Sequence, residues 1–253
     1  MHSTLQGLPR LPVVMIFTSV DLARGLHHLL RSGLIYSSRS TRPRIRMSHS
    51  TARRVLVPVA DGSEDVETVA VVDVLRRAGV SVDVASVESG RKAVVLSRGC
   101  RLEADALLAD CAGHEYDMIC IPGGMPGAQR IADSAEFGRT LAAQHAGGRW
   151  IAAICAAPAV VLVPHAIIGS GTAATCHANF ASRLPGGGDH SGARVVVDDT
   201  ARLVTSLGPG SAIEWALECV ACLQGRDAAL AVAKPMHLQP GPDGAPWAPL
   251  ARK

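Results

Sequence analysis

Aromatic side chains are scarce in this sequence, and charged ones are few. The 253 residues include three Trp, two Tyr and three Phe, while 19% are charged and 48% are hydrophobic. A hydrophobic core with so few rings must consist of Val, Leu, Ile and Ala, which is typical of a parallel sheet covered by helices. The composition therefore predicts a globular protein with a sizeable aliphatic core.

The sequence also lacks a long hydrophobic run and a strong charge of one sign. The longest apolar stretch near the amino terminus, residues 11–20, is too short to span a bilayer. The formal net charge is +3, and most of the positive excess lies in the first 54 residues, where arginines outnumber the single acid Asp21. Because the apolar run is short, we expect no membrane, and because the rest of the chain is mildly acidic, we expect no nucleic acid among the partners of the domain.

The two ends of the chain differ from its middle. Residues 1–52 are rich in Arg and Ser and poor in acids, the composition of an organelle transit peptide. Alternatively, translation starts at Met47, and residues 1–46 are an artefact or a variable extension. The first reading predicts a mitochondrial protein and the second a cytoplasmic one. Residues 239–253 form a Pro/Gly-rich tail outside the expected domain, which spans 53–238.

The cysteines do not have the dense, even arrangement of a secreted disulfide framework. There are seven, scattered along the chain. Cys219 and Cys222 are three residues apart in an expected helix, without a second such pair or a cluster of His ligands. We therefore predict no metal site and a reducing compartment.

The middle of the chain alternates between strand and helix patterns. Short runs of branched residues, separated by segments with helical spacing and closing glycines, predict one α/β domain with a mainly parallel sheet. Strands are expected at 54–60, 80–87, 116–124, 149–154 and 172–176, with a hairpin of 193–199 and 201–206; helices are expected between the first two strands and at 135–148, 158–167 and 211–225.

Cys155 follows the expected strand 149–154 and lies among small residues, in "AAICAAP". Ligands of open α/β sheets bind at the carboxyl ends of the strands. A thiol at a sharp strand-to-helix turn there is placed like the nucleophile of an elbow. A following helix amino terminus should lower the thiol pKa below about 8.5. The alternative is an inert buried cysteine.

Other residues should reach the same edge of the sheet. Glu67 opens the helix after the first strand, and a carboxyl group near an apolar thiol pocket keeps its proton. It can then donate a hydrogen bond to sulfur or move a proton in catalysis. His177 follows the expected strand 172–176. The backbone N–H groups of Gly124 and Ala156 can form an oxyanion hole.

Four ordered segments carry a resemblance to a known family. They read "VLVPVADGSEDVETVAVVDVLRRAGVSV", "IPGGMPGAQ", "IAAICAAP" and "TSLGPGSAIEWAL". Together they resemble the ThiJ/PfpI superfamily, most of all its Parkinson-disease-associated branch of small deglycase or glyoxalase III proteins. The resemblance covers about residues 53–238. It implies a flavodoxin-like three-layer sandwich, with the cysteine at a strand-to-helix elbow, and a homodimer.

The resemblance also implies roles for individual residues. Cys155 corresponds to the family's reactive cysteine, Glu67 to its protonated acid and His177 to its active-site histidine. The oxyanion amides fall on Gly124 and Ala156. Two basic residues are expected beside the pocket or at the dimer edge, namely Arg77 and Arg98. The protease-like branch has His directly after the nucleophile, and Ala156 at that position argues against a peptidase.

Two functions follow from these residues. The first is a glyoxalase III or deglycase that needs no metal, glutathione or other cofactor. Its substrates are methylglyoxal, glyoxal or their early adducts, and it protects against carbonyl and oxidative stress. The alternative is a redox sensor or chaperone that uses oxidation of Cys155 without turnover. Catalysis needs His177, whereas sensing needs only Cys155 and Glu67.

Overall fold

The computed structural model describes residues 53–187, 193–238 and 251–252. The predictions for residues 1–52, including the transit peptide and the start at Met47, lie outside the described residues. Of the Pro/Gly-rich tail, residues 251–252 form a short strand, and 239–250 and 253 lie outside the description.

One eight-stranded sheet organises the domain, in the order β10-β8-β9-β7-β6-β1-β2-β5. Its pairs are parallel except β8 with β9, which form the predicted antiparallel hairpin. A separate antiparallel pair joins β3 to β4. The strands are β1 (Arg54–Val59), β2 (Ser81–Ser86), β3 (Ala93–Val95), β4 (Arg101–Glu103), β5 (Ala106–Leu107), β6 (Met118–Ile121), β7 (Trp150–Ile154), β8 (Val195–Asp198), β9 (Leu203–Ser206) and β10 (Ala251–Arg252).

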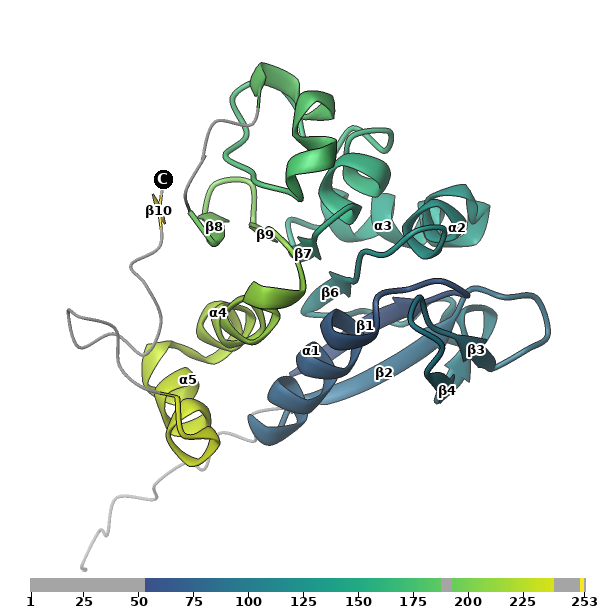
Figure 1. Ribbon diagram of the computed structural model, residues 1–253, viewed down its shortest axis with the longest axis horizontal. Coiled ribbons are helices and arrows are strands. Elements are labelled where there is room, and N and C mark those ends of the chain that lie inside the picture. Colours follow the sequence, from purple (N-terminus) through teal and green to yellow (C-terminus); the bar gives the residue numbers. More distant parts are fainter. Residues whose placement is uncertain (1–52, 188–192, 239–250, 253) are drawn as a thin grey trace, which may run out of the picture. The chain divides into compact units, whose positions relative to one another are not determined.

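Helices cover both faces of the sheet (Figure 1). They are α1 (Asp65–Arg77), α2 (Gly127–Asp133), α3 (Ala135–Ala146), α4 (Ala212–Gln224) and α5 (Arg226–Ala233). Short helical turns are η1 (Leu108–Cys111), η2 (Pro158–Leu162), η3 (Ala178–Arg183), η4 (Pro185–Gly187), η5 (Pro209–Ser211) and η6 (Lys234–Met236).

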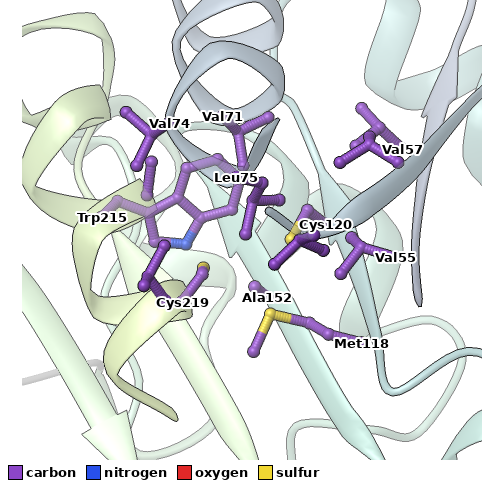
Figure 2. Close-up of a cluster of buried hydrophobic side chains, with 14 of the residues drawn as sticks. Val55, Val57, Val71, Val74, Leu75, Met118, Cys120, Ala152, Trp215 and Cys219 are labelled. Carbon is purple, nitrogen blue, oxygen red and sulfur yellow. The ribbon is translucent and has the colours of Figure 1, made fainter. Parts of the chain in front are cut away.

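Alternate strand residues enter two separate hydrophobic clusters, as side chains on a strand must. In β1, Val55 and Val57 join a cluster with α1, α4 and α5, whereas Leu56 joins a cluster with α2 and α3. Figure 2 shows the first cluster, in which Val55 and Trp215 are among the buried side chains. The predicted three-layer sandwich with an aliphatic core is confirmed, because each sheet face carries its own helical layer.

Two predicted elements differ in the structure. The helix expected at 158–167 is a single five-residue π-helix, η2. The strand expected at 172–176 does not form, because its backbone N–H groups bond to side chains instead of a neighbouring strand. Ala173 N–H donates to Asp198 Oδ2 at 2.9 Å, and Thr175 N–H donates to Thr205 Oγ1 at 2.9 Å.

Several short elements were not predicted at all: the β3–β4 hairpin, β5, α2 and α5. Within the residues described, no helix combines the length and apolar character that a bilayer crossing would need.

Candidate active site

Cys155 directly follows β7 and has a φ of 64°, in the left-handed region that non-glycine residues rarely adopt. Hydrogen bonds on both sides hold this backbone. Cys155 N–H donates to the Ser206 carbonyl at 3.0 Å, and the Cys155 carbonyl accepts from His177 N–H at 2.8 Å. A strained residue persists only where its surroundings over-determine it, at a cost of about 1–3 kcal/mol. The predicted elbow is therefore present.

Glu67 lies in the first turn of α1 and is fully buried. Its N–H donates to the side chain of Glu64, which caps the helix, at 2.8 Å. Gly123 N–H donates to Glu67 Oε2 at 2.8 Å. The other carboxyl oxygen, Oε1, is buried and has no partner with hydrogen-bond geometry among the described residues. The carboxyl group also interacts with the Cys155 side chain, which acts to lower the pKa of Glu67.

His177 caps η3 and is half-buried. Its Nδ1 accepts a hydrogen bond from Asn179 N–H at 3.2 Å. A neutral imidazole that accepts at Nδ1 carries its proton on Nε2. The ring also makes an edge contact with Phe180, with centroids 6.3 Å apart. His177 is thus held in one orientation with Nε2 as a donor.

The three side chains meet around Gly208. A Cβ atom built on Gly208 would lie 3.7 Å from His177 Cδ2 and 3.9 Å from Glu67 Oε1. The same atom would lie 4.0 Å from Cys155 Sγ. The structure therefore brings together the cysteine, acid and histidine that the sequence predicted, from three distant segments.

The loop after β6 closes the site from another side. Gly124 has a φ of +83°, and a Cβ there would lie 2.5 Å from Glu64 N, so only glycine fits. A Cβ on Gly123 would lie 2.7 Å from Cys155 Cβ. The N–H groups of Gly124 and Ala156 hydrogen-bond the Cys155 sulfur and act to lower its pKa. Both N–H groups therefore lie beside the sulfur, and their predicted oxyanion role stays a prediction.

The ionisation of the pair differs from the prediction. Burial raises the pKa of Glu67 to about 7. Burial, then the neighbouring Glu67 carboxylate, raises the pKa of the Cys155 thiol to about 12, despite the amides of Gly124 and Ala156. The predicted lowering of the thiol pKa is wrong in this structure, since η2 is too short to supply a strong helix dipole and the sulfur is largely desolvated. A thiolate here requires that Glu67 hold the shared proton.

The two arginines lie apart from these groups within one chain. Arg77 is at the far end of α1, about 15 Å along the helix from Glu67, and pairs with Asp73 at 2.7 Å. Arg98 is exposed, and its backbone N–H donates to Asp65 Oδ2 at 2.8 Å. Arg77 is therefore not beside the pocket of its own chain. A role of either arginine at a dimer edge stays a prediction.

One cluster outside the site has metal-ligand types. Asp83, Cys111 and His114 offer ligand atoms within 4.8 Å of one another. Arg54 already bonds two of them, with Nε 2.9 Å from Asp83 Oδ2 and Nη2 3.1 Å from His114 Nδ1. This guanidinium supplies the positive charge that a metal ion would bring, so we assign the cluster a structural role.

Comparison with known proteins agrees with the motifs. A model of the DJ-1/PfpI family matches residues 53–222. This chain belongs to the DJ-1/PfpI family. The predicted resemblance is thereby confirmed, and the sheet, the elbow cysteine and the buried acid are features of a DJ-1/PfpI domain as this chain builds it.

Individual relatives match most of the chain. Protein DJ-1 homolog B of Arabidopsis thaliana is 36% identical over 219 residues, which are 86% of this chain and 49% of the relative, so the chain spans about half of that protein. The glutathione-independent glyoxalase DJR-1.2 of Caenorhabditis elegans is 35% identical over 76% of this chain and 99% of its own. Oxidized DJ-1 from Toxoplasma gondii superposes with a TM-score of 0.69 and 44% identity, covering 73% of this chain and 98% of that one.

Three residues of the β9 region were missing from the sequence-based site: Thr205, Ser206 and Gly208. The segment "TSLGPG" that contains them was recognised as a motif, but their contacts with residues 155 and 175 join segments far apart in sequence. The motif itself was the one signal that could have singled them out.

Proposed function

We propose that this protein is a glutathione-independent glyoxalase that converts methylglyoxal to lactate, or glyoxal to glycolate, with Cys155 as its nucleophile. The observation that carries the proposal is the fully buried Glu67 carboxyl, which interacts with the side chain of the strained Cys155. The same chemistry on early adducts of aldehydes would appear as deglycation, and protection against carbonyl stress would follow from it.

The reaction starts with proton transfer from the thiol to Glu67. The thiolate then attacks the aldehyde carbon, forming a C–S bond, and the carbonyl oxygen becomes a hemithioacetal oxyanion. The N–H groups of Gly124 and Ala156 stabilise this negative charge. The Glu67 proton then passes to the oxyanion, which leaves Glu67 as a carboxylate ready to act as a base.

An internal redox exchange follows. A base removes the proton from the former aldehyde carbon, giving an enediol, and a proton returns to the neighbouring carbon. The first carbon is thereby oxidised to a thioester and the second reduced to an alcohol, so no external oxidant or reductant is needed. Water cleaves the C–S bond and releases the 2-hydroxy acid and the thiol. Glu67 moves protons at the sulfur, and His177 donates from Nε2 toward the substrate oxygen.

Two findings support this assignment. The site contains an acid, a thiol and an imidazole close to the bare backbone of Gly208, and no cation of the described residues pairs with Glu67. A relative at 35% identity bears the name glutathione-independent glyoxalase. Both findings favour turnover of a small aldehyde at Cys155.

The test is methylglyoxal consumption with chiral detection of lactate, on the full chain and without glutathione or added metal. We expect turnover in the parent protein and none in Cys155→Ser. Cys111→Ser is the matched control and should retain activity, because Cys111 lies in the separate Arg54 cluster. Equal turnover in the parent and Cys155→Ser would contradict the proposal.

Redox sensing by Cys155 remains the rival function. It requires a thiolate in the resting protein, whereas burial and Glu67 raise the thiol pKa. Absence of turnover together with selective oxidation of Cys155 by dilute peroxide would favour sensing over catalysis.

A further inference from the structure

The segment that carries His177 is attached to the sheet in an unusual way. At residues 173, 175 and 177 its N–H groups donate in turn to Asp198 Oδ2, Thr205 Oγ1 and the Cys155 carbonyl. Alternate N–H groups along one edge are those that a strand offers to its neighbour. Here two side chains and one carbonyl replace the neighbouring strand. The segment's position therefore depends on those side chains.

Two consecutive residues of β9 hold Cys155 and the segment that carries His177. Thr205 is fully buried and accepts from Thr175 N–H at 2.9 Å. The next residue, Ser206, accepts from Cys155 N–H through its carbonyl at 3.0 Å. The backbone bond from Ser206 is independent of its side chain, whereas the bond from Thr205 exists only through the hydroxyl. The Thr205 hydroxyl thus anchors the histidine segment to β9, two residues before the direct bond from His177 N–H to the Cys155 carbonyl.

We propose that Thr205 is a positioning residue for His177, setting where the imidazole lies relative to the Cys155 sulfur. Asp198 is the less specific anchor, because its Oδ1 also accepts from Thr200 N–H and Ala201 N–H in the hairpin turn. Loss of the Thr205 hydroxyl leaves the buried N–H of Thr175 without its acceptor, and such a group costs enough free energy for the segment to shift. A shift of about 1 Å near reacting atoms can cost about 100-fold in rate.

The experiment compares Thr205→Val, Thr205→Ser and Thr205→Cys in the full chain. Valine matches the shape and lacks the acceptor, serine keeps the acceptor, and the cysteine sulfur is a weak one. We expect kcat for methylglyoxal to fall roughly 10-fold to 100-fold in the valine variant and less than about threefold in the serine variant, with cysteine between them. The rate of Cys155 alkylation should stay unchanged in all three, since Ser206 still holds the elbow.

A second arm separates positioning from general damage. In a His177→Ala background, Thr205→Val should cause no further loss of kcat, because Thr205 acts through the missing imidazole. An equal loss in both backgrounds, or a parallel fall in Cys155 alkylation, would overturn the proposal. If the valine variant does not fold, the graded serine and cysteine variants decide by the same criteria.

This inference rests on the proposed function only for the turnover readout. The His177 ring signals in ¹H–¹⁵N NMR spectra provide another that needs no activity. They should change in Thr205→Val and stay as in the parent in Thr205→Ser. A parent without turnover but with this pattern would contradict the glyoxalase proposal and leave the positioning role supported; unchanged ring signals in the valine variant would contradict the positioning role.

Discussion

Two groups in this domain contain a cysteine, a histidine and a carboxylate. One lies at the carboxyl ends of the strands and the other at their amino ends. The first, Cys155 with Glu67 and His177, follows the carboxyl end of β7. The second, Cys111 with Asp83 and His114, lies where β1 and β6 begin, beside Arg54. Their composition is alike. Their charges are arranged differently, and so are their backbones.

In the second group every charge has a partner. Asp83 Oδ2 accepts from Arg54 at 2.9 Å and from the Tyr116 hydroxyl at 2.9 Å. In the first group the buried Glu67 has no cation beside it, and one of its oxygens has no hydrogen-bond partner among the described residues. Burial without a counter-charge raises the pKa of Glu67 to about 7, the range in which a group can exchange protons at neutral pH. The comparison teaches that the pKa of Glu67 is raised because this carboxyl group is buried without a counter-charge, whereas Asp83 is paired with an arginine, although a cysteine and a histidine accompany both carboxyl groups.

The largest expected difference between the groups is in turnover. Cys155→Ser should lower kcat for methylglyoxal by more than about 1000-fold, since it removes the nucleophile. Cys111→Ser should leave kcat within about twofold. Steady-state lactate production measures both. A large loss in Cys111→Ser, in a variant with native circular dichroism, would show that the two groups are not independent.

The next difference concerns stability, and its sign is opposite in the two groups. The pKa of Glu67 is raised from 4.5 to about 7 on folding. Between these values the folded state keeps a proton that the unfolded state has lost, so the free energy of unfolding falls as pH rises through this window. Glu67→Gln removes that loss and should raise the free energy of unfolding at pH 8 by up to about 3 kcal/mol, while kcat falls at least about 100-fold.

Asp83→Asn is the matched change in the other group. It removes the charge that faces Arg54 and should lower the free energy of unfolding by about 1 kcal/mol at pH 8, with no loss of kcat. Urea unfolding at pH 5 and pH 8 checks both variants. If Glu67→Gln lowered the free energy of unfolding at pH 8 as much as Asp83→Asn does, Glu67 would be ionised and well solvated in the folded protein.

The fold could be predicted from the sequence because its long elements have clear patterns. The apolar run of β1, the spacing in α1 and the closing Gly79 each indicate one element without help from the rest of the chain. The β3–β4 hairpin was missed because its strands have three residues each. The strand at 172–176 was predicted from its branched residues, but whether N–H groups meet a strand or side chains depends on tertiary contacts.

The residues of the site could be predicted from the sequence, but the pKa of Cys155 could not. The carboxyl ends of the expected strands placed Glu67, Cys155 and His177 on one side of the sheet, and the structure brings the three side chains together around Gly208. The direction of the Cys155 pKa shift was missed because it depends on desolvation and on the distance to Glu67. Neither quantity is visible in sequence. Thr205 was missed for the same reason, since its bond crosses about thirty residues of chain.

A smaller expected effect is a difference between Cys155 and Cys111 in how alkylation depends on pH. Because Glu67 and Cys155 titrate as a coupled pair, the pair loses its first proton near pH 7, the pKa of Glu67. Alkylation of Cys155 by iodoacetamide should therefore accelerate through an apparent pKa near 7 in the parent. In Glu67→Gln no carboxyl group remains to take the thiol proton, and the acceleration should move to higher pH. Cys111 should stay unmodified throughout, because it is buried and burial raises its pKa.

Peptide mapping by mass spectrometry at each pH distinguishes the two cysteines. An unchanged profile in Glu67→Gln would show that the thiol ionises independently of the acid.

The smallest expected effect tests the cation that sets the groups apart. Arg54→Met keeps the apolar stem and removes the guanidinium that bonds Asp83 at 2.9 Å and lies 5.2 Å from the Tyr116 ring centroid. About a third of this side chain is exposed, so water screens the pair and we expect a loss of about 1 kcal/mol or less, or about 2–4 °C in Tm. Arg77→Met, which breaks a more exposed pair with Asp73, should cost less. Both variants should keep parental kcat, because neither arginine contacts Cys155, Glu67 or His177 within one chain. A fall in kcat for Arg54→Met alone would mean that the charge of Arg54, at the amino ends of the strands, affects the site at their carboxyl ends.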